Sequence, residues 1–109
     1  MSEVFNTMSK LQVGLRYEDR LEGLSNYTTW KERIKLVLQV NRIWDFYEKE
    51  IKEPSDPKEL EIWKEMDTKA RLIILDGVKD LLIPHVFGKN NAHEIFMALH
   101  NLFQNKNEN

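Results

Sequence analysis

A chain of 109 residues, of which 41% are hydrophobic and 31% are charged, has the composition of a single globular domain. The formal net charge is -2 and neither half of the chain is basic, which argues against a direct nucleic-acid site. Cysteine is absent, which excludes disulfides, thiol nucleophiles and cysteine-based zinc sites.

The N-terminal segment, residues 1–20, carries apolar side chains that sustain neither a helical nor a strand period. We expect it to form an arm that is partly irregular. Between Met1 and Leu15 no apolar run has the length of a signal peptide, and nowhere does the chain approach the roughly 20 apolar residues of a membrane span. We therefore expect a soluble protein of the cytoplasm, with access to the nucleus left open and no membrane partner.

The first clear helix signal follows Asn26, where apolar residues recur every three or four positions. This stripe consists of Tyr27, Trp30, Ile34, Val37 and Leu38. Either Asn26 or Thr29 can supply the oxygen that caps the first turn, so the start of the helix stays open by about one turn. The pattern predicts an amphipathic helix with one buried face.

A compact aromatic group comes next and predicts a helical turn or a short second helix that packs against the first. Consecutive side chains of one short helix cannot all face the core. We therefore treat Trp44, Phe46 and Tyr47 as candidate interface residues, with burial in the core as the alternative. Trp44 and Tyr47 are expected at the edge of that interface.

A long helix is predicted to start at Asp56, Pro57 and Glu59. Aspartate caps free N–H groups, proline suits the first turn, and glutamate can reach back to the cap. The buried stripe of this helix is formed by Leu60, Trp63, Met66, Ala70, Ile73 and Ile74. Asp67 and Arg71 are four residues apart in the favourable acid-first order, which adds support to the helix.

The long helix is predicted to end at residues 76–77, and a short apolar segment follows it. Pro84 disfavours a helical conformation at Ile83, so a kink or a break is expected there. Asn91, with Glu94 three residues later, then predicts the start of the last helix. The apolar face of the last helix consists of Ala92, Ile95, Phe96, Leu99, Leu102 and Phe103.

The chain carries no signal for a catalytic, cofactor or metal site. His85, His93 and His100 lack the spacing of a helical zinc site, and we interpret them as surface imidazoles beside the last apolar face. Carboxylates alternate with lysine and arginine as on a solvated surface, and no nucleotide-binding or nucleophile motif occurs. We therefore predict a protein that is not an enzyme and uses no cofactor.

The residues expected to build the core lie on the predicted apolar faces. They are Tyr27, Trp30, Ile34, Leu38, Trp63, Ala70, Ile74, Leu82, Ile95, Leu99 and Leu102. Together these faces predict an all-α fold, an irregular bundle of four to five helices over residues 21–104, after an extended N-terminal arm. Residues 105–109 are polar and are expected to form a disordered tail.

Two blocks of the chain carry a family resemblance. The first block is Leu21-Glu22-Gly23-Leu24-Ser25-Asn26-Tyr27-Thr28-Thr29-Trp30-Lys31, followed by Ile34, Leu38 and Trp44. The second block runs from Trp63 through residues 67–75 and 81–86 to residues 92–96, and closes with Leu99, Leu102 and Phe103. In their order and separation, the two blocks resemble the Gag polypeptides of copia-type retrotransposons.

The resemblance implies a helical domain like the N-terminal domain of a retroviral capsid, which self-associates into a shell that packages RNA. It implies architectural roles for Asn26, Tyr27, Trp30, Trp63, Asp67 and Ala70. Phe96 departs from the tryptophan that is usual in the family. The chain also stops soon after Phe103, before the downstream capsid half, zinc knuckle and protease, so we expect a fragment or a host-retained remnant.

We therefore expect a non-catalytic, Gag-like structural module that associates with copies of itself or contributes to a virus-like particle shell. The alternative is a host-retained adaptor that uses the same helical surface to bind another Gag-like protein or a host protein. In both cases we expect the helical surface of this chain to bind another protein surface.

Overall fold

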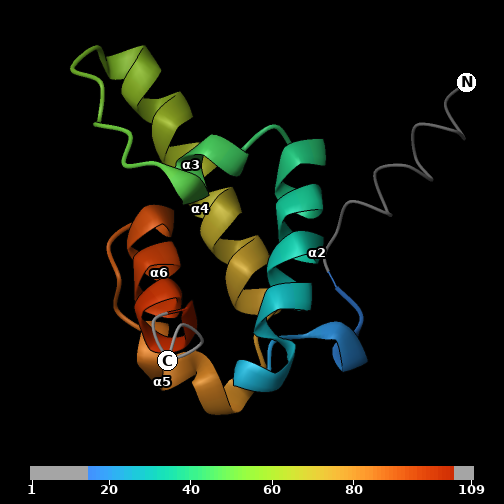
Figure 1. Ribbon diagram of the computed structural model, residues 1–109. Coiled ribbons are helices and arrows are strands. Elements are labelled where there is room, and N and C mark those ends of the chain that lie inside the picture. The colour runs from blue at the N-terminus through green and yellow to red at the C-terminus, as the bar shows by residue number, and fades with distance from the viewer. Residues whose placement is uncertain (1–14, 105–109) are drawn as a thin grey trace, which may run out of the picture.

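The chain forms a bundle of helices, and the computed structural model describes residues 15–104 (Figure 1). Its α-helices are α2 (Tyr27–Val40), α3 (Trp44–Glu48), α4 (Pro57–Asp76), α5 (Ile83–Val86) and α6 (Ala92–Leu99). The remaining turns are the 3-10 turns η1 (Tyr17–Asp19), η2 (Leu24–Asn26) and η3 (Asp80–Leu82) and the π-helical turn η4 (His100–Gln104). No strand occurs within residues 15–104, which confirms the predicted all-α fold.

The helices are arranged around α4, the longest of them. α2 and α4 run in opposite directions along the bundle, and α6 lies beside α4 (Figure 1). The short helix α3 contacts α2, α4 and α6 and so joins the three longer helices. As a result, the start of α2 and the end of α4 lie at the same end of the bundle (Figure 1).

The segment before α2 is joined to the end of α4 through Gly77. The Gly77 carbonyl oxygen accepts hydrogen bonds from the Leu21 backbone N–H at 2.9 Å and from the Trp30 indole Nε1–H at 2.7 Å. The backbone N–H of Lys79 donates to the Leu21 carbonyl oxygen at 2.9 Å, within an isolated parallel bridge between Leu21 and Val78. These bonds satisfy backbone groups in both segments, which lie far apart in the sequence.

Asn26 stabilises the turn that precedes α2. α2 begins directly after Asn26, but the Asn26 side chain makes no capping bond to it. The Oδ1 atom of Asn26 instead accepts from the backbone N–H groups of Glu22 at 3.0 Å and Gly23 at 3.4 Å, while Nδ2 donates to the Arg20 carbonyl oxygen at 2.9 Å. Of the two candidate caps, Asn26 therefore precedes the helix without a side-chain capping bond, because its amide is engaged by the preceding turn, and Thr29 is the third residue of α2.

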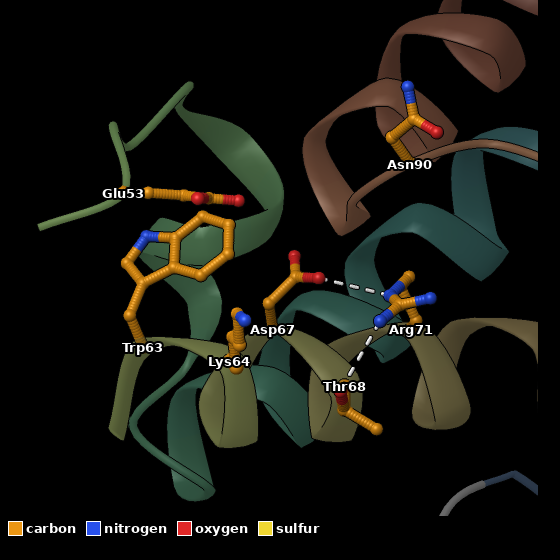
Figure 2. Close-up of a pocket in the computed structure, with 7 residues that line it drawn as sticks. All are labelled: Glu53, Trp63, Lys64, Asp67, Thr68, Arg71 and Asn90. Atoms are coloured by element: carbon orange, nitrogen blue, oxygen red, sulfur yellow. Dashed lines mark hydrogen bonds and ion pairs between the residues drawn. The ribbon is translucent and has the colours of Figure 1, made fainter. Parts of the chain in front are cut away.

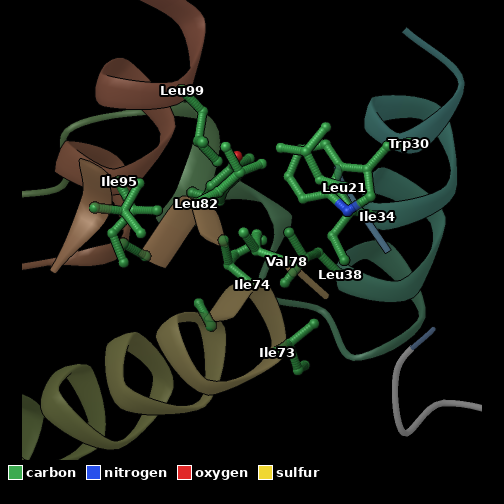
Figure 3. Packing of buried hydrophobic residues seen from close by; sticks show 14 of the residues in the cluster. Leu21, Trp30, Ile34, Leu38, Ile73, Ile74, Val78, Leu82, Ile95 and Leu99 are labelled. Carbon is green, nitrogen blue, oxygen red and sulfur yellow. The ribbon is translucent and has the colours of Figure 1, made fainter. Parts of the chain in front are cut away.

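One apolar cluster joins α2, α3, α4 and α6 (Figure 3). Among its buried members are the predicted Tyr27, Trp30, Ile34, Leu38, Ala70, Ile74, Leu82, Ile95 and Leu99. Leu102 is half-buried against this cluster, and Trp63 is half-buried on α4. Ile73, Ala92 and Phe103, which lie on the predicted apolar faces, are buried as well, and so is Tyr47. Buried residues that no predicted face includes are Leu21, Ile43, Val78 and Val86.

The long helix α4 begins and ends where the sequence predicts. The Asp56 carboxylate accepts hydrogen bonds from the backbone N–H groups of Lys58 and Glu59, both at 3.1 Å, and Pro57 is the first helical residue. Gly77 follows the last residue of the helix. In the part of the chain that the structure describes, α4 and every other helix is too short or too polar to span a membrane.

The expectation that Pro84 keeps Ile83 out of a helical conformation is wrong, although the helix changes from 3-10 to α between Leu82 and Ile83. Ile83 has helical backbone angles, φ -54° and ψ -41°, and it begins α5 with Pro84 in the first turn. Proline is tolerated in a first turn because the N–H groups there have no acceptor within the helix. The 3-10 turn η3 therefore runs directly into α5.

The last helix begins at the predicted cap. The Asn91 side-chain oxygen accepts a hydrogen bond from the Glu94 backbone N–H at 2.9 Å, and α6 starts at Ala92. In return, the Glu94 carboxylate accepts from the backbone N–H of Asn90 at 3.1 Å. Both side chains therefore satisfy free N–H groups at the helix start.

Regular helix ends at Leu99, although the apolar pattern predicts that it continues to Phe103. The π-helical turn η4 covers this last stretch. A π turn holds more residues than an α-helical turn, which shifts the direction of the side chains that follow it. Phe103 is buried with its ring centroid 5.3 Å from that of Tyr27, while Leu102 stays half-buried.

Most of the predicted arm, residues 1–14, and the predicted tail, residues 105–109, lie outside the described residues. Of the remaining arm, Leu15 packs against the core cluster. The carboxylate of Asp19 lies 3.2 Å from the Arg33 guanidinium and so joins η1 to α2.

Candidate functional site

The aromatic residues of α3 lie on more than one side of the helix. The rings of Trp44 and Tyr47, three residues apart, contact each other at a centroid distance of 5.7 Å. Trp44 is half-buried, and Tyr47 lies in the core. Phe46 contacts α4, with its ring centroid 6.2 Å from that of Trp63. The structure therefore does not join the candidate interface residues into one exposed patch.

Tyr47 is a core residue, which corrects its assignment to the edge of an interface. Its side chain is 1% exposed, and its ring meets Phe96 edge-on at a centroid distance of 4.9 Å. Burial raises the pKa of Tyr47 well above its usual range, with a smaller contribution from the nearby Tyr27 phenol. Burial also raises the pKa of Tyr27. Both rings hold the fold together and offer nothing to a partner.

These tyrosines predict that the fold loses stability in alkaline solution. Unfolded tyrosine releases its proton near pH 10, whereas burial keeps the protons of Tyr27 and Tyr47 to higher pH. Their contribution is therefore complete below about pH 10 and is lost as the pH rises above it. Denaturant unfolding between about pH 8 and about pH 11 measures the loss. The Tyr47→Phe variant should lose less, and an equal loss in both proteins would contradict this account.

Trp44 is partly accessible, as is Phe46. Its indole Nε1–H donates to the Glu48 carboxylate at 2.7 Å, and the Lys35 ammonium nitrogen lies 5.6 Å from the ring centroid. A shallow depression beside it is lined by Gln39, Arg42, Trp44 and Asp45. The charged side chains near the ring are Lys35, Arg42, Asp45 and Glu48. This surface is therefore polar and mixed in charge, and it is not an apolar patch for a partner protein.

Two of the three histidines pack against an aromatic ring of α6. The rings of His93 and His100 both stack on Phe96 at centroid distances of 5.9 Å, and the His93 Nδ1 atom lies 3.1 Å from the Tyr47 carbonyl oxygen. Both are half-buried, so their interpretation as surface imidazoles is wrong, whereas His85 is exposed. Within residues 15–104, no group of three histidine or carboxylate side chains is placed to hold a metal ion.

Asp67 joins α4 to the start of α6. Its side chain lies in a pocket lined by Glu53, Trp63, Lys64, Asp67, Thr68, Arg71 and Asn90 (Figure 2). The residue is 3% exposed, and Oδ1 accepts a hydrogen bond from the Ala92 backbone N–H at 2.8 Å. Oδ2 accepts from Arg71 Nε at 3.0 Å (Figure 2). Both oxygens of Asp67 therefore accept hydrogen bonds. The negative charge of Asp67 also interacts favourably with the positive N-terminal end of the α6 dipole.

Sequence reasoning predicted the Asp67 pair with Arg71 but missed the bond to Ala92. The pair follows from a spacing of four residues within one helix. The bond to Ala92 joins two helices, and no local pattern indicates it. Asp67 therefore has a structural role in positioning α6, in keeping with the architectural role that the resemblance implies.

Sequence reasoning also missed the aliphatic side chains that the bundle leaves exposed. Leu36 and Val40, on α2, are 61% and 51% exposed. Ile62 and Leu72, on α4, are 56% and 68% exposed. All four lie off the predicted buried stripes, and an apolar residue beside a buried stripe is the signal that could have shown them. The outer faces of α2 and α4 therefore replace α3 as the candidate protein-binding surface.

The family comparison matches the N-terminal part of the bundle. Residues 21–46 match the family model described as a domain of unknown function (DUF4219). Neither the curated proteins nor the solved structures give a match. The matched residues comprise the turn before α2, α2 itself and the start of α3, so they include Leu21, Asn26 and Trp30.

Proposed function

We propose that the chain is a non-catalytic structural module, similar to the capsid region of copia-type Gag polypeptides, that works by associating with copies of itself. The proposal is supported by the contacts of the residues that carry the resemblance. Leu21 and Trp30 of the first block both donate to the Gly77 carbonyl oxygen. Asp67 of the second block binds the backbone N–H of Ala92. The residues shared with the family pattern therefore hold this bundle together.

The exposed aliphatic side chains on the outer faces of α2 and α4 are the observation that carries self-association. Leu36, Val40, Ile62 and Leu72 each leave half or more of their side chains in solvent. Apolar residues on the outer face of a helix are the usual anchors of a helix-mediated contact between proteins. Because the net charge is -2, we assign this module to protein contacts and not to direct nucleic-acid binding. We propose the cytoplasm as its location.

Sedimentation velocity tests this function. The purified chain should show a sedimentation coefficient that rises with concentration between about 10 µM and about 1 mM, at low and at moderate salt. Growth beyond the monomer is the result that the proposal predicts. A strict monomer over the whole range would contradict it.

A second candidate is a host-retained adaptor for another Gag-like or host protein. Phe87 favours it, because this ring is 79% exposed at the end of α5 and lies outside α2 and α4. An adaptor would remain a monomer at every concentration and would bind a Gag polypeptide in a manner that Phe87→Ala abolishes. Self-association that Phe87→Ala leaves unchanged would favour the first candidate.

A further inference from the structure

The outer face of α4 carries a line of exposed residues with the spacing of a coiled-coil seam. The line, which we call the α4 seam, consists of Lys58, Ile62, Glu65, Lys69, Leu72 and Asp76, and all six are exposed. Successive members are four, three, four, three and four residues apart. This alternation keeps them in one row along the helix, about 27 Å long at 1.5 Å per residue.

The α4 seam is distinct from the buried side of the same helix. The buried residues of α4 are Asp67, Ala70, Ile73 and Ile74. None of them belongs to the seam. A depression beside the seam is lined by Lys64, Glu65, Thr68, Lys69 and Leu72, so part of the row borders a hollow surface. The N-terminal turns of α4 also reach beyond α3 and α6, together with the loop that precedes them (Figure 1).

The seam is self-complementary about the level of Asp67. Its members form three pairs at equal sequence distances on either side of Asp67, namely Glu65 with Lys69, Ile62 with Leu72, and Lys58 with Asp76. In an antiparallel helix pair with a two-fold axis at this level, each residue faces the other member of its own pair in the second copy. Glutamate then meets lysine, aspartate meets lysine, and isoleucine meets leucine.

We propose that a second copy of this chain binds along the α4 seam to form an antiparallel, two-fold symmetric dimer. This inference deepens the self-association proposed above and rests on it. A parallel pair would set lysine against lysine and glutamate against glutamate, so the charge order selects the antiparallel arrangement. The apolar part of the contact is short, so the expected dissociation constant is on the order of 0.1–1 mM.

The inner charged pair, Glu65 with Lys69, is the best place to test the seam. In the outer pair, Asp76 already lies 3.7 Å from the Arg20 guanidinium of its own chain, which competes with Lys58 of a second copy. Glu65 and Lys69 lie nearest to the proposed axis. Reversing either charge sets like charges against each other twice in a symmetric dimer, because each residue contributes from both copies.

The variants Glu65→Lys and Lys69→Glu should each weaken self-association about tenfold at low salt. Both positions are exposed, so the variants should keep the circular dichroism spectrum and the melting temperature of the parent chain. Glu61→Lys on α4 and Lys89→Glu in the loop before α6 are the control variants. They make the same charge changes at exposed positions outside the seam and should leave association unchanged.

An equimolar mixture of the two weakened variants gives the sharper result. In a mixed dimer, the new lysine at position 65 faces the new glutamate at position 69, and the native Lys69 faces the native Glu65, so the affinity of the parent chain should return. Sedimentation velocity at one fixed total concentration measures this recovery. Weak association in the mixture as well would overturn the antiparallel register.

The remaining outcomes separate this inference from the proposed function. If both single variants associate as strongly as the parent chain, the α4 seam is overturned while self-association stands. If the parent chain itself stays monomeric at about 1 mM, both proposals fail.

Discussion

Replacement of Trp30 by alanine is expected to lower the free energy of unfolding by about 4 kcal/mol. The side chain is 1% exposed in the cluster shown in Figure 3, and its Nε1–H donates to the Gly77 carbonyl oxygen at 2.7 Å. Alanine leaves a cavity and removes the bond between the start of α2 and the end of α4. The loss is a large part of the roughly 5–15 kcal/mol that stabilises a typical domain, and urea unfolding followed by circular dichroism measures it.

The variant Trp30→Phe separates the apolar contribution from the hydrogen bond. Phenylalanine retains most of the buried ring but lacks the donor, while the Gly77 carbonyl oxygen keeps its bond from the Leu21 backbone N–H. The expected cost is therefore only about 1–2 kcal/mol. A cost below about 1 kcal/mol for Trp30→Ala would contradict the central place of this residue in the core.

Replacement of Asp67 by alanine is expected to cost about 3 kcal/mol. The substitution removes the acceptor of the buried Ala92 N–H and the partner of Arg71 in one step. It also removes a negative charge from the start of α6, where the helix dipole favours one. Chemical unfolding measures the loss, and amide hydrogen exchange should show that α6 opens more readily than α2.

Two further variants test the reason for that loss. Asp67→Asn retains an oxygen for the Ala92 N–H but lacks the charge, so it should cost less than the alanine variant. Glu61→Ala removes an exposed carboxylate from the same helix and should change the stability by no more than about 0.5 kcal/mol. Equal effects of Glu61→Ala and Asp67→Ala would show that the buried contacts of Asp67 do not matter.

Helix starts, helix ends and buried faces that depend on neighbouring residues were predictable from the sequence. Asp56 and Asn91 cap the helices that follow them, and Gly77 ends α4, because each of these signals acts over a few neighbouring residues. The apolar spacing of α2 likewise predicts its buried face, since every member of a helical stripe turns inward together.

Structure that depends on distant segments was not predictable in this way. Asparagine is a common capping residue, but the side chain of Asn26 pairs with the backbone N–H of Glu22 and the carbonyl oxygen of Arg20 instead. Tyr47 and Trp44 are both aromatic residues of α3, and no local pattern shows that Tyr47 is the one buried edge-on against Phe96 of α6. Ile83 is helical before a proline because it starts a helix, which the local preference does not reveal.

The exposed residues on the outer face of α4 were also not predictable from the local sequence pattern. In the sequence, Ile62 and Leu72 each stand beside a member of the predicted buried stripe, Trp63 or Ile73, but neither lies on that stripe. The fold leaves them exposed on one face with Glu65 and Lys69 between them. Only then does the symmetric order of charged and apolar residues become apparent.

An NMR dilution series of the isotope-labelled chain tests the central claim, self-association through the α4 seam, most directly. Amide shifts would be followed from about 1 mM down to about 10 µM. The account predicts that the shifts that change with concentration fall within residues 58–76, on the outer face of α4, and that they fit a single dissociation constant. Shifts that stay constant over the whole range, or that change only around Phe87, would contradict it.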